Sequence, residues 1–252
     1  MKSNIFLTFA AALSNALGVA AAPSRASTRA RLSSLGQSSA AGPNTLTNTH
    51  WSGGLLKTRG VTNVQGSFVI PSVSGQDPND SVAVWVGIDG AGGGNCGNTL
   101  MQAGILIFGD GSIQPWYEWW PEESIQYFNE NWDVAAGDNI FMQITANSTT
   151  SGVATLTNQR TNQSLTHYFT PRESPGALCE VYADWIVEAI SFGNSFATLP
   201  DFGTITFTDT LANTASGTVT ADSGDIINMS GYQNNNVNCR HAGSGSVSCT
   251  RV

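Results

Sequence analysis

Short runs of apolar, β-branched and aromatic residues recur along the chain after residue 44, and Gly, Asn, Ser, Asp and Pro separate them. No pattern of helical period and ordinary helix length occurs in this part. Many short strands between turns are typical of a β-sandwich or barrel. The expected strands, ten or more, include 64–70, 82–89, 99–108, 116–120, 139–146, 153–158, 165–170, 184–190, 204–208 and 217–221. No internal repeat and no second linker interrupts the pattern, so we expect residues 44–252 to form one domain.

One of these runs, residues 183–190, carries a carboxylate among apolar residues. Strand alternation places Asp184, Ile186, Glu188 and Ile190 on one face. Both faces are mostly apolar, so we expect a central strand that is covered on both sides. A carboxylate there is costly unless it is hydrogen-bonded, protonated or facing a wet cleft. Glu188 is therefore either a satisfied structural residue or a functional one.

A second acid lies in the run Trp116-Tyr117-Glu118-Trp119-Trp120. Alternation places Trp116, Glu118 and Trp120 on one face. An acid between two indoles is what a substrate groove presents, and it is equally what a sheet core with one paired Glu presents. Glu118 is therefore the strongest competitor of Glu188 for a catalytic role.

Two further runs carry polar residues in apolar surroundings. Trp85 and Asp89 share a face of the run 82–89, and Gln102 is the odd member of the apolar face of the run 99–108. A carboxylate beside a carboxamide is a plausible hydrolytic pair, because the acid takes a proton from water and the amide N–H donates to the oxyanion. We therefore ask whether Gln102 meets Glu188.

The first 43 residues differ from the rest of the chain. Residues 1–22 contain Lys2, an interrupted apolar run and the small residues Val19-Ala20-Ala21-Ala22, which is typical of a secretory signal peptide and too short to span a membrane. Residues 23–43 carry three arginines among Ser, Ala and Gly, and no acid, which indicates a basic pro-segment or a linker. We therefore expect a secreted, extracellular protein with no membrane span.

The charge of the remainder is strongly negative. Removing the four basic residues of the first 43 positions takes the net charge from −8 to −12. Such a body attracts a cationic leader and offers no basic patch for nucleic acid. Charged residues make up only 11% of the chain, against roughly 25% in ordinary proteins. Few cations would remain to repel one another in acid, so the composition suits a protein that works at low pH.

Four cysteines fit an oxidising compartment and allow three pairings. Cys239 and Cys249 flank a Gly- and Ser-containing segment that is typical of a hairpin loop, so a local bridge between them is natural, which leaves Cys96 with Cys179. A bridge between Cys96 and Cys179 would start the strands of Gln102 and Glu188 from a common point. The cysteine spacings do not predict a zinc site. Nothing in the sequence indicates oligomerisation, so we expect a monomer.

From about residue 48 onward the chain resembles the eqolisins, the fungal glutamic peptidases. The similarity lies in several ordered motifs, which are far more specific together than singly. They are His50-Trp51-Ser52-Gly53-Gly54, Trp85-Val86-Gly87-Ile88-Asp89-Gly90, Leu100-Met101-Gln102-Ala103-Gly104, Gly109-Asp110-Gly111, Trp116-Tyr117-Glu118-Trp119-Trp120-Pro121-Glu122 and Ala183-Asp184-Trp185-Ile186-Val187-Glu188.

The resemblance implies an all-β, antiparallel two-sheet β-sandwich of the jelly-roll or concanavalin-like kind, with a concave face that binds polypeptide substrates. It also implies an endopeptidase that is active in acid and uses no metal or other cofactor. The family's catalytic pair falls on Glu188, as an ionised general base and then acid, and on Gln102, as the group that positions water and stabilises the oxyanion. Positions that line or support the site fall on Trp85, Asp89, Trp116, Glu118 and Asp184. The Cys96–Cys179 bridge is also the family's pattern.

The chain departs from the family at three positions near these motifs. Gln114 stands where the family typically has an acid, Trp120 where it often has Tyr, and Asp184 where it has Glu. Two other classes stay open from the residues alone. A concanavalin-like glycoside hydrolase would use Glu118 and Glu188 as paired carboxylates, and a non-catalytic sandwich would bind carbohydrate on its aromatic face.

Overall fold

The computed structural model describes residues 26–27, 44–171, 176–193 and 195–252. The expected signal peptide, 1–22, and all of the expected leader, 23–43, except residues 26–27 lie outside the described residues. The described part is built from strands, and its helical segments are the short 3-10 turns η1 (Gly94–Asn98), η2 (Ala221–Ser223) and η3 (Tyr232–Asn234). None of its helices is long and apolar enough to cross a membrane.

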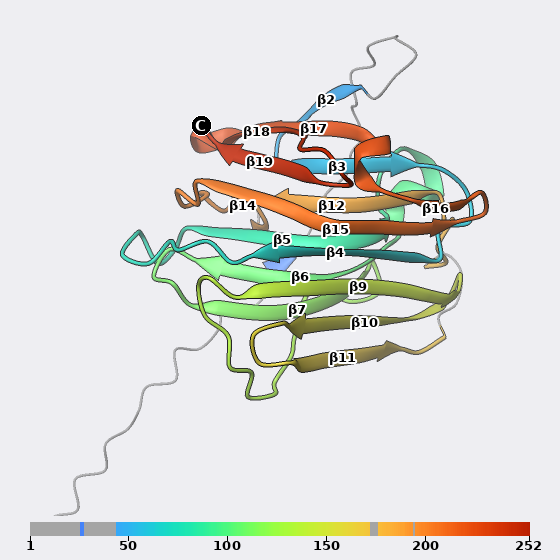
Figure 1. Ribbon diagram of the computed structural model, residues 1–252, viewed down its shortest axis with the longest axis horizontal. Coiled ribbons are helices and arrows are strands. Elements are labelled where there is room, and N and C mark those ends of the chain that lie inside the picture. Colours follow the sequence, from blue (N-terminus) through green and yellow to red (C-terminus); the bar gives the residue numbers. More distant parts are fainter. Residues whose placement is uncertain (1–25, 28–43, 172–175, 194) are drawn as a thin grey trace, which may run out of the picture.

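The strands form two facing layers, which lie one behind the other in Figure 1. One layer, called here the site layer, contains β2 (Thr45–Asn48), β17 (Asp225–Ser230), β18 (Asn236–His241), β19 (Val247–Arg251), β3 (Trp51–Lys57), β12 (Tyr182–Glu188), β5 (Ser81–Asp89), β6 (Leu100–Phe108), β7 (Ile113–Trp120) and β8 (Gln126–Tyr127). The other, the cover layer, contains β11 (Gln163–Phe169), β10 (Ser151–Asn158), β9 (Asn139–Ser148), β4 (Asn63–Val69), β15 (Thr204–Thr214) and β16 (Gly217–Val219). The predicted β-sandwich is confirmed.

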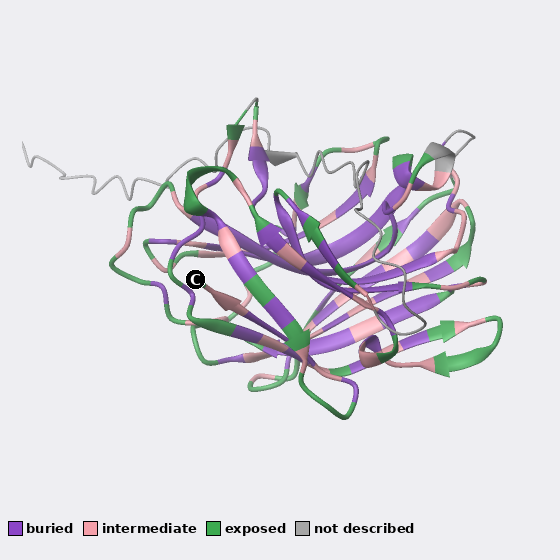
Figure 2. Ribbon diagram, turned by 90° about the horizontal axis from the view of Figure 1, so that it is seen from above, coloured by how far each residue is buried: buried purple, intermediate pink, exposed green. Residues whose placement is uncertain are grey.

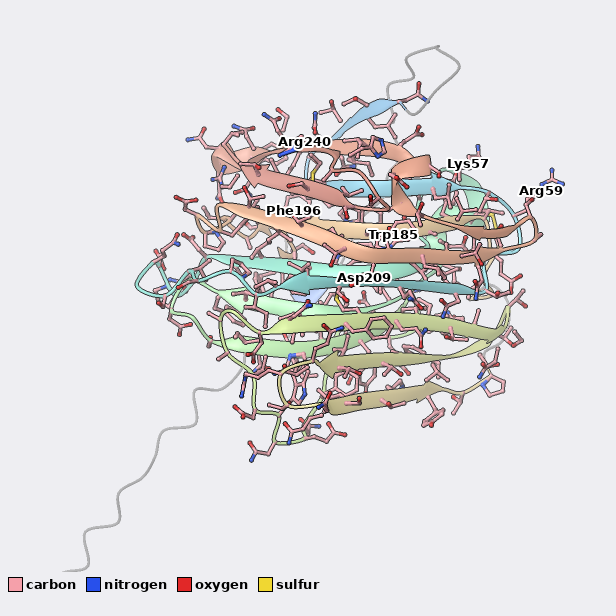
Figure 3. The ribbon with its side chains drawn as sticks, in the orientation of Figure 1. Lys57, Arg59, Trp185, Phe196, Asp209 and Arg240 are labelled. Carbon is pink, nitrogen blue, oxygen red and sulfur yellow. A yellow bond between two sulfur atoms is a disulfide. The ribbon has the colours of Figure 1, made fainter. Side chains whose placement is uncertain are left out.

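One long strand joins the two layers. The first part of β15, from Thr204 to Phe207, pairs with β19 in the site layer. After a shift of register between Thr208 and Leu211, the strand pairs with β4 in the cover layer. Asp209 lies at this irregularity with φ of 51°, and Figure 3 shows it on the outer side of the cover layer. A bulge bends the strand, so a single strand can pair with β19 in one layer and with β4 in the other. The pairings are antiparallel except that of β2 with β17, which is parallel.

The two layers differ in how they are buried, as Figure 2 shows. In β9 and β10 buried residues alternate with partly exposed ones, because one face packs on the core and the other meets water. Every residue of β5 and β12 is buried, so both faces of the site layer are covered at its centre. The main core lies between the layers, and a second apolar cluster covers the outer face of the site layer. Trp185 links the two layers by donating its indole N–H to the Gln65 carbonyl oxygen at 2.7 Å.

A short hairpin follows β12, the strand that carries Glu188. It consists of β13 (Ser191–Phe192) and β14 (Ser195–Phe196). The described fragment of the leader, β1 (Ala26–Ser27), pairs antiparallel with β13 and completes a small separate sheet. The leader therefore meets the body three residues after Glu188.

Candidate active site

The two residues of the predicted catalytic pair project from the same face of the site layer. Directly opposite residues of antiparallel strands point to the same side of a sheet. Gln102 in β6 is opposite Gly87 in β5, which is in turn opposite Asp184 in β12. Asp184 and Glu188 share a face because even spacing along a strand preserves direction. Glu188 and Gln102 therefore lie on the outer face of the site layer, with β5 between their strands.

The Glu188 carboxyl is buried, with 1% of the residue exposed. The indole Nε1 of Trp85 donates to Glu188 Oε2 at 2.8 Å, whereas Oε1 has no hydrogen-bond partner in the described structure. Burial raises the pKa of Glu188 to about 8, because the charged form loses its water. The Trp85 N–H lowers the pKa of Glu188 and so opposes the effect of burial. Trp51 acts in the same direction as Trp85, although its indole N–H does not meet the geometry of a hydrogen bond. The charge of Glu118 raises the pKa of Glu188 further.

This pKa changes the expected protonation of Glu188. The family resemblance implied an ionised carboxylate, but with a pKa of about 8 the Glu188 carboxyl is protonated throughout the acid range. The physical reason is that no cation compensates the charge, and a single indole donor does not offset the loss of solvent. In the substrate-free site Glu188 is therefore a neutral carboxylic acid with one proton to give, and Oε1 is the oxygen that Trp85 leaves available.

Gln102 is oriented by the other candidate acid. Gln102 and Glu118 are directly opposite in the pairing of β6 with β7, and both residues are fully buried. Gln102 Nε2 donates to Glu118 Oε2 at 2.6 Å. A short hydrogen bond to a carboxylate is stronger than one between neutral groups. Glu118 therefore fixes the direction of the carboxamide and supports Gln102 in the site.

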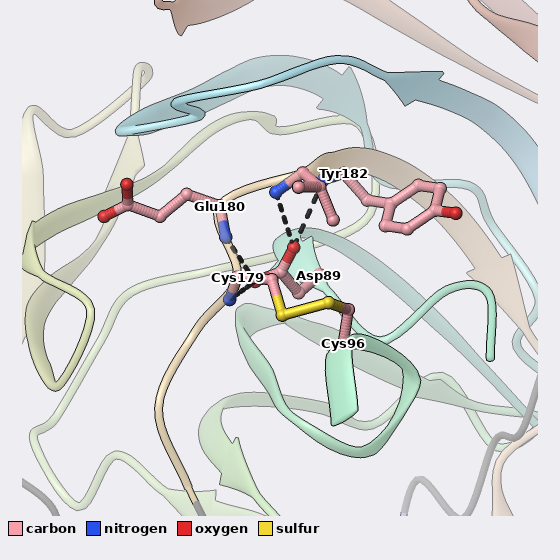
Figure 4. The surroundings of a disulfide bond; sticks show 6 residues. Asp89, Cys96, Cys179, Glu180 and Tyr182 are labelled. Carbon is pink, nitrogen blue, oxygen red and sulfur yellow. Dashed lines mark hydrogen bonds between the residues drawn. A yellow bond between two sulfur atoms is a disulfide. The ribbon is translucent and has the colours of Figure 1, made fainter. Parts of the chain in front are cut away.

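Asp89 holds the start of the strand that carries Glu188. Its carboxylate accepts four backbone N–H bonds, from Cys179, Glu180, Val181 and Tyr182, at 2.7, 2.8, 2.8 and 3.2 Å. Figure 4 shows these bonds beside the Cys96–Cys179 disulfide, which joins the same two segments. Burial raises the pKa of Asp89, and the four donors oppose that shift. Asp89 thus supports the site from beneath. Both expected disulfides are confirmed, the second being Cys239–Cys249.

Asp184 and Trp116 lie on the same face as Glu188 and Gln102 without the contacts that fix those residues. Both carboxyl oxygens of Asp184 are buried and have no hydrogen-bond partner in the described structure. Burial, and then the charge of Asp89, raise the pKa of Asp184 well above its ordinary value. Trp116 is buried and its indole N–H also has no partner there. In the described ranges no three His, Cys, Asp or Glu side chains gather as a metal site would require.

Two residues of this face were missed at the level of the sequence. Trp51 is directly opposite Glu188 in the pairing of β3 with β12. Tyr127 is opposite Trp116 in the pairing of β7 with β8. Strand alternation in residues 51–57 would have placed Trp51 on one face. The glycines at positions 53 and 54 have low strand propensity, so this segment was not recognised as a strand. No sequence signal marks Tyr127, because β8 is only two residues long.

Comparison with known proteins identifies relatives over nearly the whole body. The model of the Peptidase A4 family matches residues 49–251. Aspergillopepsin-2 from Aspergillus niger is 32% identical over 204 residues, which cover 72% of this chain and 70% of the relative. Scytalidopepsin B from Scytalidium lignicola is 33% identical over 211 residues, which cover 81% of this chain and 78% of the relative.

Solved structures agree with these relatives. Scytalido-glutamic peptidase, crystallised with a transition-state analogue inhibitor, superposes with a TM-score of 0.72 at 31% identity, covering 81% of this chain and 99% of that chain. Aspergilloglutamic peptidase from Aspergillus niger superposes with a TM-score of 0.59 at 33% identity, covering 69% of this chain and 99% of that chain. The match decides for peptide-bond hydrolysis over the glycosidase and carbohydrate-binding alternatives. The chain belongs to the peptidase A4 family, the glutamic peptidases or eqolisins.

Proposed function

We propose that this protein is a secreted, monomeric acid endopeptidase in which Glu188 transfers protons and Gln102 stabilises the oxyanion. The observation that carries the proposal is the placement of both buried side chains on one sheet face, each held by a specific partner. Trp85 holds Oε2 of Glu188, and Glu118 holds one N–H of Gln102. Groups fixed in advance in a water-poor site stabilise developing charge without reorganising.

The reaction begins with Glu188 protonated. A water molecule attacks the carbon of the scissile peptide carbonyl, and its proton passes to the Glu188 carboxyl. At the same time the carboxyl gives its own proton to the carbonyl oxygen, whose developing charge accepts an N–H of Gln102. The product of this step is a neutral tetrahedral diol, and Glu188 again carries one proton. Because Oε2 is held by Trp85, Oε1 is the oxygen that we assign to this exchange.

The second step breaks the bond between carbon and nitrogen. Glu188 gives its proton to the peptide nitrogen, which leaves as an amine. One hydroxyl of the diol then returns a proton to Glu188 as the new carboxylic acid forms. The residue ends in the state in which it began, so one side chain acts as base and acid in turn.

Two substitutions test these roles. Loss of one oxyanion donor lowers turnover by about 10²–10³, so we expect Gln102→Ala to fall at least that far and Glu188→Gln to be almost inactive. Gln126→Ala is the matched control, because Gln126 is exposed on β8 and bonds only to the Ser124 carbonyl. Cleavage of denatured protein at pH about 3–4 gives the rates, and near-ultraviolet circular dichroism confirms the fold. Near-normal proteolysis by either variant would refute the assignment.

We further propose that residues 1–22 direct secretion and that residues 23–43 are a pro-segment that keeps the enzyme latent. The pairing of β1 with β13, close behind Glu188, supports this assignment. The segment and the body also carry opposite charges, which supports the same assignment. The whole chain has a net charge of −8, and without Lys2 and the three arginines of the leader the remaining residues carry −12. Acid protonates the carboxylates of the body and thereby weakens the attraction.

The secreted chain purified at neutral pH tests the pro-segment. We expect acidification to trigger loss of mass from the N-terminus and appearance of activity together. A variant with Arg25, Arg29 and Arg31 all changed to Ala is expected to show activity without the lag, because the attraction is already lost. Equal lag in both proteins, or full activity of the uncut chain, would argue against latency.

A further inference from the structure

Polar atoms without partners gather on the outer face of the site layer. Tyr127 Oη and Trp116 Nε1 are both buried and have no hydrogen-bond partner in the described structure. Buried polar atoms in folded proteins are nearly always paired, so each exception needs a reason. Glu188 Oε1, on the same face, is also buried without a hydrogen-bond partner. The proposed function explains this atom, because Oε1 exchanges protons with the substrate and the attacking water. We ask whether the two donors have a reason of the same kind.

The pairing of strands places these two donors side by side. Trp116 in β7 is directly opposite Gly104 in β6 on one side and Tyr127 in β8 on the other. Tyr127 therefore points to the same face as Trp116. Both rings belong to or pack against the apolar cluster of the outer face. Burial raises the pKa of Tyr127, so its hydroxyl remains a neutral O–H group throughout the acid range.

The order of the strands relates this pair to the catalytic residues. From Glu188 outward the order is β12, β5, β6, β7 and β8. Gln102 lies on β6 and is held by Glu118 on β7, two positions along from Trp116. Tyr127 thus lies beyond Gln102, on the side away from Glu188. An extended peptide whose scissile bond lies between Glu188 and Gln102, and which continues across β7, meets Trp116 and then Tyr127.

The chemistry of the two groups fits the main chain of a peptide. An indole N–H is only a donor, and a phenol O–H donates readily. The main chain of an extended peptide offers a carbonyl acceptor at every residue, whatever its side chains. We propose that Tyr127 and Trp116 bind the backbone of the polypeptide substrate, by donating to carbonyl oxygens on one side of the scissile bond. The inference rests on the proposed function, because it takes the position of the scissile bond from Glu188 and Gln102.

The variant Tyr127→Phe removes one oxygen atom and keeps the ring. The chain offers a matched control in Tyr117→Phe, since Tyr117 lies on the opposite face, packs against the core between the layers and stacks on His167. The loss of one hydrogen bond corresponds to about a tenfold change in binding. We expect Tyr127→Phe to lower kcat/KM for a long peptide about tenfold through a higher KM, with kcat nearly unchanged. We expect Tyr117→Phe to leave both constants unchanged.

Stability separates this role from a structural one. Removing a buried hydroxyl that has no partner leaves the substrate-free fold as stable or more stable, so the Tm of Tyr127→Phe should equal or exceed that of the parent. For peptides shortened from the end that crosses β8, the parent and Tyr127→Phe should become equal. A kcat/KM within twofold of the parent for the long peptide, or a lower Tm with a parallel loss of kcat, would overturn the inference. An inactive parent enzyme would instead refute the proposed function.

Discussion

Glu188, the proposed catalytic acid, owes its protonation state to the groups that surround it, and each neighbour acts in a definite direction. Burial favours the protonated form of Glu188, the Trp85 indole favours the charged form, and the charge of Glu118 again favours the protonated form. The balance gives a carboxyl with a pKa of about 8. An enzyme that starts from the protonated form loses activity as the pH rises through that pKa. The alkaline limb of the pH profile therefore reports on the neighbours of Glu188.

Trp85→Phe removes the indole donor and keeps an aromatic ring. Because the N–H stabilises the charged form, its loss raises the pKa of Glu188 further. We expect the alkaline limb of kcat/KM to move to higher pH, and kcat to fall about tenfold because Oε2 is no longer held. Trp116→Phe is the control, since its indole does not bond to Glu188, and the limb should stay in place. A limb that moves equally in both variants would show that ring packing is the cause.

Glu118→Gln shifts the same limb in the opposite direction. The carboxamide can still accept from Gln102, but the negative charge that raises the pKa of Glu188 is gone. The alkaline limb should therefore move to lower pH, with a modest loss of kcat because the hydrogen bond to Gln102 becomes weaker. Complete loss of peptide cleavage would contradict a supporting role and would make Glu118 the reacting acid. A pH profile of the purified variant, at matched substrate, provides the measurement.

At the residue scale the sequence predicted faces but not contacts. Alternation placed Glu118 between two indoles and Glu188 in a covered strand, and both placements are found. The bond between Gln102 and Glu118 depends on the register of the hairpin that joins β6 to β7, which spacing alone does not set. The pKa of Glu188 depends on burial by residues from several strands. Neither quantity is local, so neither could be derived from the order of the amino acids.

At the scale of elements, prediction was good where a strand alternates or is strongly apolar. The expected strands at 82–89 and 99–108 differ from β5 and β6 by one residue at their starts. The strands β3 and β17 were missed, because Gly, Asn and Ser within them resemble turn sequences. The hairpin loop expected between Cys239 and Cys249 joins β18 to β19. The expected strand at 204–208 continues to Thr214 as β15, since a bulge at Asp209 carries the pairing into the other layer. Long-range pairing overrides local propensity at these places.

Asp89, at the end of β5, connects that strand to the start of β12 through its hydrogen bonds. The variant Asp89→Asn tests how much these bonds stabilise the fold. The asparagine keeps one acceptor oxygen but turns an N–H₂ group toward partly buried backbone donors, which then lack an acceptor. We expect a loss of about 3 kcal/mol in the free energy of unfolding, which corresponds to a fall in Tm of about 6–12 °C. Asp110→Asn, in an exposed turn where the carboxylate accepts the Ser112 N–H, should change Tm little. Thermal unfolding at pH 7, where Asp89 is in its charged form, gives both values, and equal shifts would exclude a special role for Asp89.

For the whole molecule, one carboxylate extends stability toward strong acid. Asp138 is buried and accepts Arg160 Nε at 2.5 Å, Asn158 Nδ2 at 2.7 Å and the Ala135 N–H at 2.9 Å. The hydrogen bond from Arg160, opposed by burial, lowers the pKa of Asp138 to about 2. A depressed carboxyl pKa stabilises the fold above the ordinary pKa of 3.8, and the effect is lost as the pH falls through about 2. We expect Asp138→Asn to lower Tm by several degrees between pH 4 and 7, with a difference that closes below pH 2. A constant difference at all pH values would show that packing, not charge, is responsible.

At the other end of the pH range, Glu188, the proposed catalytic residue, limits the stability of the fold. The pKa of Glu188 is raised from an ordinary 4.5 to about 8, so its contribution to stability is complete below pH 4.5 and is lost as the pH rises to about 8. At about 1.4 kcal/mol per pKa unit the loss amounts to about 5 kcal/mol, and Asp184, raised by burial and by Asp89, acts in the same direction. Glu188→Gln cannot ionise and keeps an acceptor for Trp85, so we expect it to match the parent Tm at pH 4 and to exceed it by about 10 °C or more at pH 8. Glu130→Gln, at an exposed position, should follow the parent at both pH values. If Glu188→Gln also followed the parent, the Glu188 carboxyl would be solvated in the native state. A variant that gains stability at pH 8 while it loses activity would show that the burial which keeps the proposed catalytic acid protonated also limits the stability of the folded enzyme at higher pH.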